Sequence, residues 1–121
     1  MITAIVRYEL PAHIDYAACR AHYHQIAPGF REAMGLISKH FIWNENWAGG
    51  VYQWESLEAA QAFYSGPWRD GIIERYGTPP EIEFCEVFAI TDNARGTVEL
   101  FEEPVLPLRQ SRHEPVLRPV R

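Results

Sequence analysis

The sequence lacks any apolar run near the roughly 20 residues that a helix needs to cross a bilayer. Its opening residues, MITAIVRYEL, lack the basic stretch and the small-residue cleavage site of a secretory signal. Cysteine is scarce: Cys19 and Cys85 belong to no CxxC pair, and both are expected to be small buried side chains. These absences predict a cytoplasmic protein with no membrane partner.

Basic residues are also scarce. The 121 residues carry a formal net charge of −5, and residues 1–94 hold six Lys or Arg against twelve Asp or Glu. An acidic body without a basic stripe repels phosphate backbones, which excludes nucleic acid as a partner. The composition, 47% hydrophobic and 22% charged, fits one globular domain.

The common catalytic signatures are missing as well, including GxGxxG, GK[ST], GxSxG and HExxH. His22 and His24 resemble a metal-binding pair. On a helix, however, residues two apart point about 200° away from each other, so one ion cannot bridge them. We therefore expect no metal site.

The first part of the chain predicts a strand followed by a helix. Residues 2–8, ITAIVRY, are β-branched and loosely alternating, which is typical of a strand. Asp15 suits the N-cap of a helix that begins near Tyr16. Pro28 removes a helical hydrogen bond, so a break is expected near Ala27.

Three further elements complete the pattern. Residues 36–43 and 50–55 predict the second and third strands, joined by a polar loop. A second helix follows, with Ser56 as its cap and a break at residues 65–67, Ser-Gly-Pro. Residues 81–91, EIEFCEVFAIT, predict a long fourth strand.

The order of these elements predicts an α+β, ferredoxin-like βαββαβ fold. Its four-stranded antiparallel sheet would carry two broken helices on one face. Alternation places a set of apolar side chains on the opposite face: Ile5, Ile37, Phe41, Trp43 and Val87. An apolar sheet face of that size predicts a homodimer that associates through the sheet.

The composition changes after residue 93. We therefore divide the chain into a ferredoxin-like domain, 1–93, and a proline-rich C-terminal extension, 94–121. The extension contains a rough repeat, EPVLPLR and EPVLRPVR. Two interpretations stay open: a solvated polyproline-like tail, or an arm that docks on a partner subunit.

His40 is the candidate base. Alternation from Leu36, which follows the expected end of the first helix and should pack under the helices, turns His40 towards the space between sheet and helices. Partial burial there would keep its pKa near neutrality, as a proton acceptor requires. The alternative is a structural histidine that bonds a backbone carbonyl.

Aromatic residues gather in the same predicted space. Tyr52 and Trp54 share one strand face and would meet Phe63, Tyr64 and Trp68 from the second helix. These side chains carry more polar groups than a small core needs, and both helices are broken. The combination favours a lined cavity over a solid core.

The segments GLISKHF, VYQWES and LEAAQAFY resemble the dimeric α+β barrel superfamily. More narrowly, residues 2–92 are similar to the small YdhR-like and antibiotic-biosynthesis-type monooxygenases. The resemblance implies that Trp54 matches a tryptophan at the end of the third strand of these oxygenases, and that Tyr52 and Trp68 line a pocket.

Two departures narrow what the resemblance implies. Haem-degrading members carry an iron-binding histidine late in the second helix, where this chain reads Gly71-Ile72-Ile73. Cyclase-type members carry a tyrosine and a histidine there, against Phe63 and Trp68-Arg69 in this chain. Haem breakdown and the known type of cyclisation are both disfavoured.

The sequence thus predicts a cofactor-independent monooxygenase of a small aromatic, quinol or polyketide-like compound. His40 would be the base, with Tyr52, Trp54 or Arg69 as hydrogen-bond donors to the substrate oxygen. The expected substrate-binding residues are His22, Tyr23, Phe63, Tyr64 and Trp68. The alternatives are a cyclase, isomerase or lyase that uses the same pocket without oxygen, and a non-catalytic small-molecule-binding dimer.

Overall fold

The computed structural model describes residues 1–102 and 104–107. The elements, in chain order, are β1 (Ile2–Glu9), α1 (Tyr16–Ile26), the 3-10 helix η1 (Ala27–Glu32), β2 (Leu36–Asn44), β3 (Trp47–Trp54), α2 (Leu57–Phe63), α3 (Gly66–Tyr76), β4 (Glu81–Glu86), β5 (Ala89–Asp92) and β6 (Thr97–Leu100).

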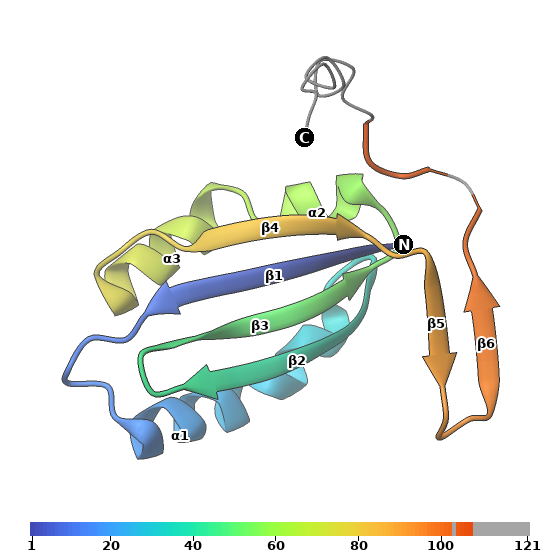
Figure 1. Cartoon of the computed structure of the whole chain (residues 1–121). Helices are drawn as coiled ribbons and strands as arrows, with labels where there is room; N and C mark the ends of the chain where they lie inside the picture. The colour runs from blue at the N-terminus through green and yellow to red at the C-terminus, as the bar shows by residue number, and fades with distance from the viewer. Residues whose placement is uncertain (103, 108–121) are drawn as a thin grey trace, which may run out of the picture.

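The first four strands form one antiparallel sheet in the order β2-β3-β1-β4, and all helices cover the same face of it (Figure 1). This arrangement confirms the predicted α+β, ferredoxin-like βαββαβ fold. Among the described residues, no helix has the length and apolar character that crossing a membrane demands.

The predicted caps and breaks are confirmed. Asp15 accepts a hydrogen bond from the Ala18 backbone N–H at 2.9 Å, which caps α1. The α-helix ends at Ile26, just before Pro28, and the chain continues as η1 from Ala27. The second helical region breaks after Phe63 and restarts at Gly66, with a proline in its first turn.

The predicted fourth strand is shorter than expected. It ends at Glu86, and the chain turns before residues 89–100, which form the hairpin β5–β6. This hairpin is a separate two-stranded sheet that stands apart from the main one (Figure 1). The predicted domain boundary at residue 93 falls in the turn of this hairpin.

A β-bulge at Ile37 overturns the predicted orientation of β2. Leu36 lies opposite Trp54, but Ser38 lies opposite Gln53, so one residue is inserted between them. Because side chains alternate, an extra residue moves every later side chain of the strand to the other face. His40 therefore lies on the open face of the sheet, and the predicted inward orientation is wrong.

The same shift corrects the expected dimer face. Phe41 was expected on the open face, yet it packs on the helix side, 5.2 Å from Tyr23 and 5.3 Å from Phe30 between ring centroids. Trp43 likewise lies on the helix side, 5.0 Å from Tyr16 of α1.

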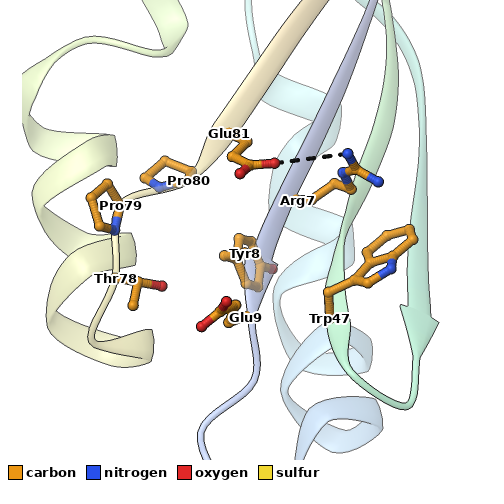
Figure 2. Close-up of a pocket in the computed structure, with 8 residues that line it drawn as sticks. All are labelled: Arg7, Tyr8, Glu9, Trp47, Thr78, Pro79, Pro80 and Glu81. Carbon is orange, nitrogen blue, oxygen red and sulfur yellow. Dashed lines mark ion pairs between the residues drawn. The ribbon is translucent and has the colours of Figure 1, made fainter.

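The open face of the sheet is consequently mixed in polarity. Its apolar centre consists of Ile5, Ile42 and Val51, each half-buried. At one end, Arg7 pairs with Glu81 at 3.7 Å and lies over the Trp47 ring (Figure 2). Cys85 is exposed on this face, which corrects the expectation that both cysteines are buried, whereas Cys19 is buried.

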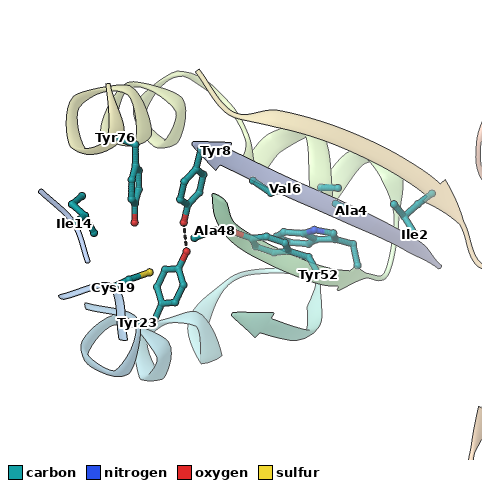
Figure 3. Packing of buried hydrophobic residues seen from close by; sticks show 12 residues of the cluster. Ile2, Ala4, Val6, Tyr8, Ile14, Cys19, Tyr23, Ala48, Tyr52 and Tyr76 are labelled. Atoms are coloured by element: carbon teal, nitrogen blue, oxygen red, sulfur yellow. Dashed lines mark hydrogen bonds between the residues drawn. The ribbon is translucent and has the colours of Figure 1, made fainter. Parts of the chain in front are cut away.

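The core lies between the sheet and the helices. Its buried members are Ile2, Ala4, Val6, Tyr8, Ile14, Cys19, Tyr23, Ala48, Tyr52, Trp54, Ala60 and Tyr76 (Figure 3). Near α1 the core is tyrosine-rich: the hydroxyls of Tyr8 and Tyr23 share a short hydrogen bond, and Tyr8 stacks on Tyr76. Burial raises the pKa of Tyr8 and of Tyr23 above the ordinary range, so both stay neutral.

The described part of the C-terminal extension returns to its own domain. The Leu106 backbone N–H donates to the Glu86 carboxylate at 3.1 Å, and Val105 and Leu106 pack against the core. Residues 108–121, which hold the second half of the EPVL repeat, lie outside the described residues.

Candidate active-site groove

A layer of aromatic side chains fills the space between β3 and the second helical region. Five predicted site residues meet there: Tyr52, Trp54, Phe63, Tyr64 and Trp68. Tyr52 and Trp54 share one strand face, so their rings stack, with 6.0 Å between the ring centroids and an interplanar angle of 8°. The structure thus brings these five together, as expected.

Trp54 is the centre of this layer and has no exposed surface. Its indole N–H donates to the Tyr64 hydroxyl at 3.1 Å. Burial raises the pKa of Tyr52 and of Tyr64 above the ordinary range. In this structure the Trp54 donor is occupied inside the protein, which is the geometry of a core residue.

Lys39 enters the space that sequence reasoning assigned to His40. The bulge places Lys39 opposite Tyr52, on the helix side of the sheet. Its Nζ lies 3.7 Å from the ring centroid of Phe30, 3.8 Å from that of Phe41 and 4.4 Å from that of Tyr52. Three aromatic rings from η1, β2 and β3 therefore surround one amine.

Gly50 on β3 makes room for the lysine stem. A Cβ at this position would lie 2.8 Å from Lys39 Cε and 2.9 Å from Cε1 of Tyr52. Any larger residue would displace the lysine, because real Cβ atoms do not approach so closely. The glycine thus leaves room for the stem of Lys39 beside the aromatic layer.

The environment of Lys39 favours its neutral form. Desolvation lowers the pKa of this amine from 10.5 to about 7. Among the described residues, no carboxylate lies within ion-pair distance of the amine to restore the charge. The rings attract an ammonium but cannot replace its water shell. Near pH 7 the side chain can therefore accept a proton.

A groove of about 450 Å³ opens beside the amine, between η1 and β2. It is lined by Ala27, Phe30, Arg31, Leu36, Ile37, Ser38, Lys39 and Phe41. The ring centroids of Phe30 and Phe63 are 5.8 Å apart, so the inner wall of the groove continues into the aromatic layer. The break at Pro28, which produces η1, shapes this wall.

Sequence reasoning missed Lys39 because the alternation count contained no bulge. One signal could have found it: Lys39 is the only lysine among the 121 residues. A single lysine within the apolar-rich segment LISKHFIW, followed ten positions later by a Gly-Gly pair, is unusual for a solvated charge.

His22 and Tyr23 lie on α1 at the other side of the groove region. Tyr23 is buried and packs against Phe41. His22 is half-buried, and its pKa is lowered first by burial and then by the nearby positive charges of Arg75 and Lys39. A smaller cavity of about 200 Å³ lies here, between α1 and the end of β2.

The remaining predicted residues lie apart from the amine. His40 is exposed on the open sheet face, opposite Val51. Arg69 is exposed on α3. A further depression of about 510 Å³, at the end of β1, contains Arg7 and Glu81, whose charges already pair (Figure 2).

No protein-family model and no curated protein sequence matches the chain. Solved structures do match. One is a candidate antibiotic biosynthesis monooxygenase from Deinococcus radiodurans, with 16% identity, a TM-score of 0.57 and coverage of 72% of this chain and 92% of the other.

Two further structures are similar. The monooxygenase from the gene ActVA-Orf6 of Streptomyces coelicolor, in complex with nanaomycin D, has 16% identity and a TM-score of 0.54. The match covers 88% of this chain and 92% of the other. The heme-degrader MhuD from Mycobacterium tuberculosis, with two hemes bound in its active site, has 21% identity and a TM-score of 0.54. The match covers 72% of this chain and 95% of the other. At identities this low, the three matches show a shared fold, which is the ferredoxin-like α+β fold that the resemblance implied.

Proposed function

We propose that this protein is a cofactor-independent monooxygenase that oxidises a small aromatic hydroxyl compound to a quinone. The observation that carries the proposal is a lysine amine at the wall of an aromatic groove, with a pKa lowered by burial to about 7, so that about half of it is neutral near pH 7. The groove supplies an apolar enclosure, and Lys39 supplies the base that oxygenation without a cofactor needs. The likeness to monooxygenases of the same fold supports the same reaction class.

The reaction balances without an external reductant. Lys39 takes the hydroxyl proton, and the electron-rich anion transfers one electron to O₂. The two radicals combine at a ring carbon to form a peroxide. The proton on that carbon moves to the terminal peroxide oxygen, the O–O bond breaks, and the departing hydroxide takes the proton held by Lys39. One oxygen atom enters the quinone, one leaves as water, and the substrate provides all four electrons.

The aromatic rings around Lys39 assist both states of the amine. They disfavour the ammonium before the substrate binds, because they exclude water. Once the proton is transferred, the ring faces and the substrate anion stabilise the ammonium. Phe30, Phe41 and Tyr52 would thus line the substrate side of the groove.

The other predicted residues take supporting roles in this proposal. Phe63, Tyr64 and Trp68 form the rigid layer behind the groove, and Trp54 anchors that layer through Tyr64. His22 and Tyr23 border the site from α1. His40 is not proposed as the base here, because it lies on the other face of the sheet.

A haem-dependent reaction is not part of the proposal. The α3 segment reads GPWRDGIIERY and offers no imidazole for an iron. Its residues Ile72 and Ile73 are half-buried and exposed, respectively.

Oxygen uptake tests the proposal directly. With 1-naphthol or 1,5-dihydroxynaphthalene, we expect the wild type to consume O₂ and to place one ¹⁸O atom in the quinone. Lys39→Met should lower kcat/KM about 100-fold or more, since removal of a general base costs that much. The wild-type rate should rise with pH through about 7.

Arg95→Met is the matched control, because it removes a cation from the exposed hairpin turn. It should oxidise the naphthols at the wild-type rate. Product formation without oxygen would instead identify a cyclase, isomerase or lyase. Tight binding with no product under either condition would identify a binding protein, and either result would overturn the proposed oxygenation.

A further inference from the structure

We propose that Lys39 is also a nucleophile, and that the groove binds an aromatic aldehyde or ketone covalently as a Schiff base on this amine. This chemistry needs no oxygen and does not rest on the proposed oxygenation. It assigns to the groove a second class of ligand, a carbonyl compound.

The first support is that the lone pair of the neutral amine is not engaged in a hydrogen bond within the described part of the chain. The contacts of Nζ are the faces of three rings, at 3.7, 3.8 and 4.4 Å from their centroids. Among the described residues, neither a salt bridge nor a hydrogen bond engages this nitrogen. A neutral amine in that setting has its nucleophilic electron pair available, which is how desolvation activates lysines for imine formation.

The second support is the shape of the site. Gly50 leaves room for the stem of Lys39 beside the aromatic layer, and Lys39 lines one wall of the groove. The groove volume of about 450 Å³ accommodates a compound of one or two rings. Phe30 and Phe41 offer ring surfaces on which an aromatic carbonyl compound can pack.

The third support concerns the rest of the ligand. Arg31 lies in the wall of the same groove and is exposed, and Ser38 adds a hydroxyl. A guanidinium at this position favours a carboxylate substituent on the bound compound. The ligand class is therefore an aromatic carbonyl compound that carries an acidic group.

The covalent step is balanced. The Lys39 nitrogen attacks the carbonyl carbon, and a proton moves from nitrogen to oxygen to give a carbinolamine. Loss of one water molecule then forms the C=N bond. No electron enters or leaves, so no oxidant or reductant is required. The apolar rings favour the neutral imine and exclude the water that would hydrolyse it.

The step should accelerate as pH rises through about 7, because only the neutral amine attacks. The titratable or charged groups that face Lys39 are Arg31 from η1, His22 from α1 and Tyr52 from β3. Burial raises the pKa of Tyr52, so its hydroxyl stays protonated through this range. His22 has a lowered pKa and is neutral above it. The titration of the Lys39 amine therefore determines how the rate of imine formation depends on pH.

Reductive trapping tests the inference without ambiguity, because the chain has a single lysine. The protein is incubated under nitrogen at pH 7 with 4-carboxybenzaldehyde and cyanoborohydride, then digested and analysed by mass spectrometry. We expect the peptide with Lys39 to gain the mass of the aldehyde minus one oxygen atom. Benzaldehyde, which lacks the carboxylate, should label it several-fold more slowly.

An internal reference keeps the test independent of any change at Lys39. Glu74→Lys places a second, exposed amine on α3, away from the open sheet face, in the otherwise unchanged protein. At pH 7, Lys39 should be labelled at least tenfold faster than that introduced amine, since an exposed lysine is almost fully protonated. Equal or slower labelling of Lys39, or labelling only at the terminal α-amine, would overturn the inference. Oxygen is absent throughout, so a failure here leaves the oxygenation experiment unaffected.

Discussion

At the scale of the residue, two side chains decide how the site is understood. Lys39 lies among three rings with no compensating carboxylate in the described chain, so its burial opposes folding. Trp54, by contrast, is completely buried and hydrogen-bonded to Tyr64, which favours folding. A residue kept at a cost to stability is a better functional candidate than one that stabilises the core.

The cost of burying Lys39 predicts a pH dependence of stability. Its pKa is about 7 in the folded state and 10.5 in an unperturbed lysine. Between these values the unfolded chain binds a proton that the folded chain has lost, so stability rises with pH across this window. Below about pH 7 both states are charged, and the folded state bears the full desolvation cost.

Lys39→Met keeps the unbranched stem and removes the charge. We expect the variant to be more stable than the parent at pH 6, on the order of 2 kcal/mol after allowance for the open groove. The advantage should shrink as pH rises towards 10. Urea denaturation at several pH values measures this, with His22 and Arg31 present in both proteins. A stability difference that does not vary with pH would contradict the assignment.

At the scale of the element, the C-terminal extension can dock on its own domain or on a partner subunit. Its described residues 104–107 dock on their own domain, through Leu106 and Glu86. The alternative predicted from the sequence, an arm on a partner subunit, concerns contacts that a single chain does not contain. Two truncations separate these interpretations because they divide the extension at residue 107.

Truncation after Glu102 removes the docked residues, whereas truncation after Pro107 keeps them. We expect the shorter chain to melt several degrees lower, since it loses the packing of Val105 and Leu106, roughly 1–2 kcal/mol. The longer one should melt with the parent. If truncation after Pro107 also lowers Tm, and lowers it more at low protein concentration, residues 108–121 act as an intermolecular arm.

At the scale of the whole molecule, the open sheet face has the features of an interface. Ile5, Ile42 and Val51 form its apolar centre, and the hairpin β5–β6 stands beside it. A concave region of about 920 Å³ lies between this face and the hairpin. On the hairpin, Val98 and Leu100 are each 65% exposed. A second copy of the chain would cover these surfaces.

We expect the protein to sediment as a dimer at micromolar concentration. Val51→Glu should convert it to a monomer, because a carboxylate would be buried without a partner at the centre of the interface. Ile73→Glu is the control: Ile73 is 38% exposed on α3, on the helix side. A wild-type protein that sediments as a monomer would refute the dimer, as would a dimer unaffected by Val51→Glu.

Local residue patterns were sufficient to predict the order of the first four strands and of the broken helices between them, although not the end of β4 or the hairpin β5–β6. Asp15 and Ser56 cap helices in the structure as predicted, since a cap depends on a side chain and a backbone N–H three residues away. The breaks at Pro28 and Gly66 follow from the missing proline N–H in the same local way. The apolar alternation of β1 determined its buried face.

Only the tertiary structure decided which side chain of β2 faces the helices. The bulge at Ile37 forms because Leu36 pairs with Trp54 and Ser38 pairs with Gln53, and such pairing joins residues far apart in sequence. Alternation fixes the relative orientation of neighbours but cannot detect one inserted residue. From alternation alone, the side chain predicted to enter the helix–sheet space was therefore His40. The register with β3 decided that it is Lys39 and not His40.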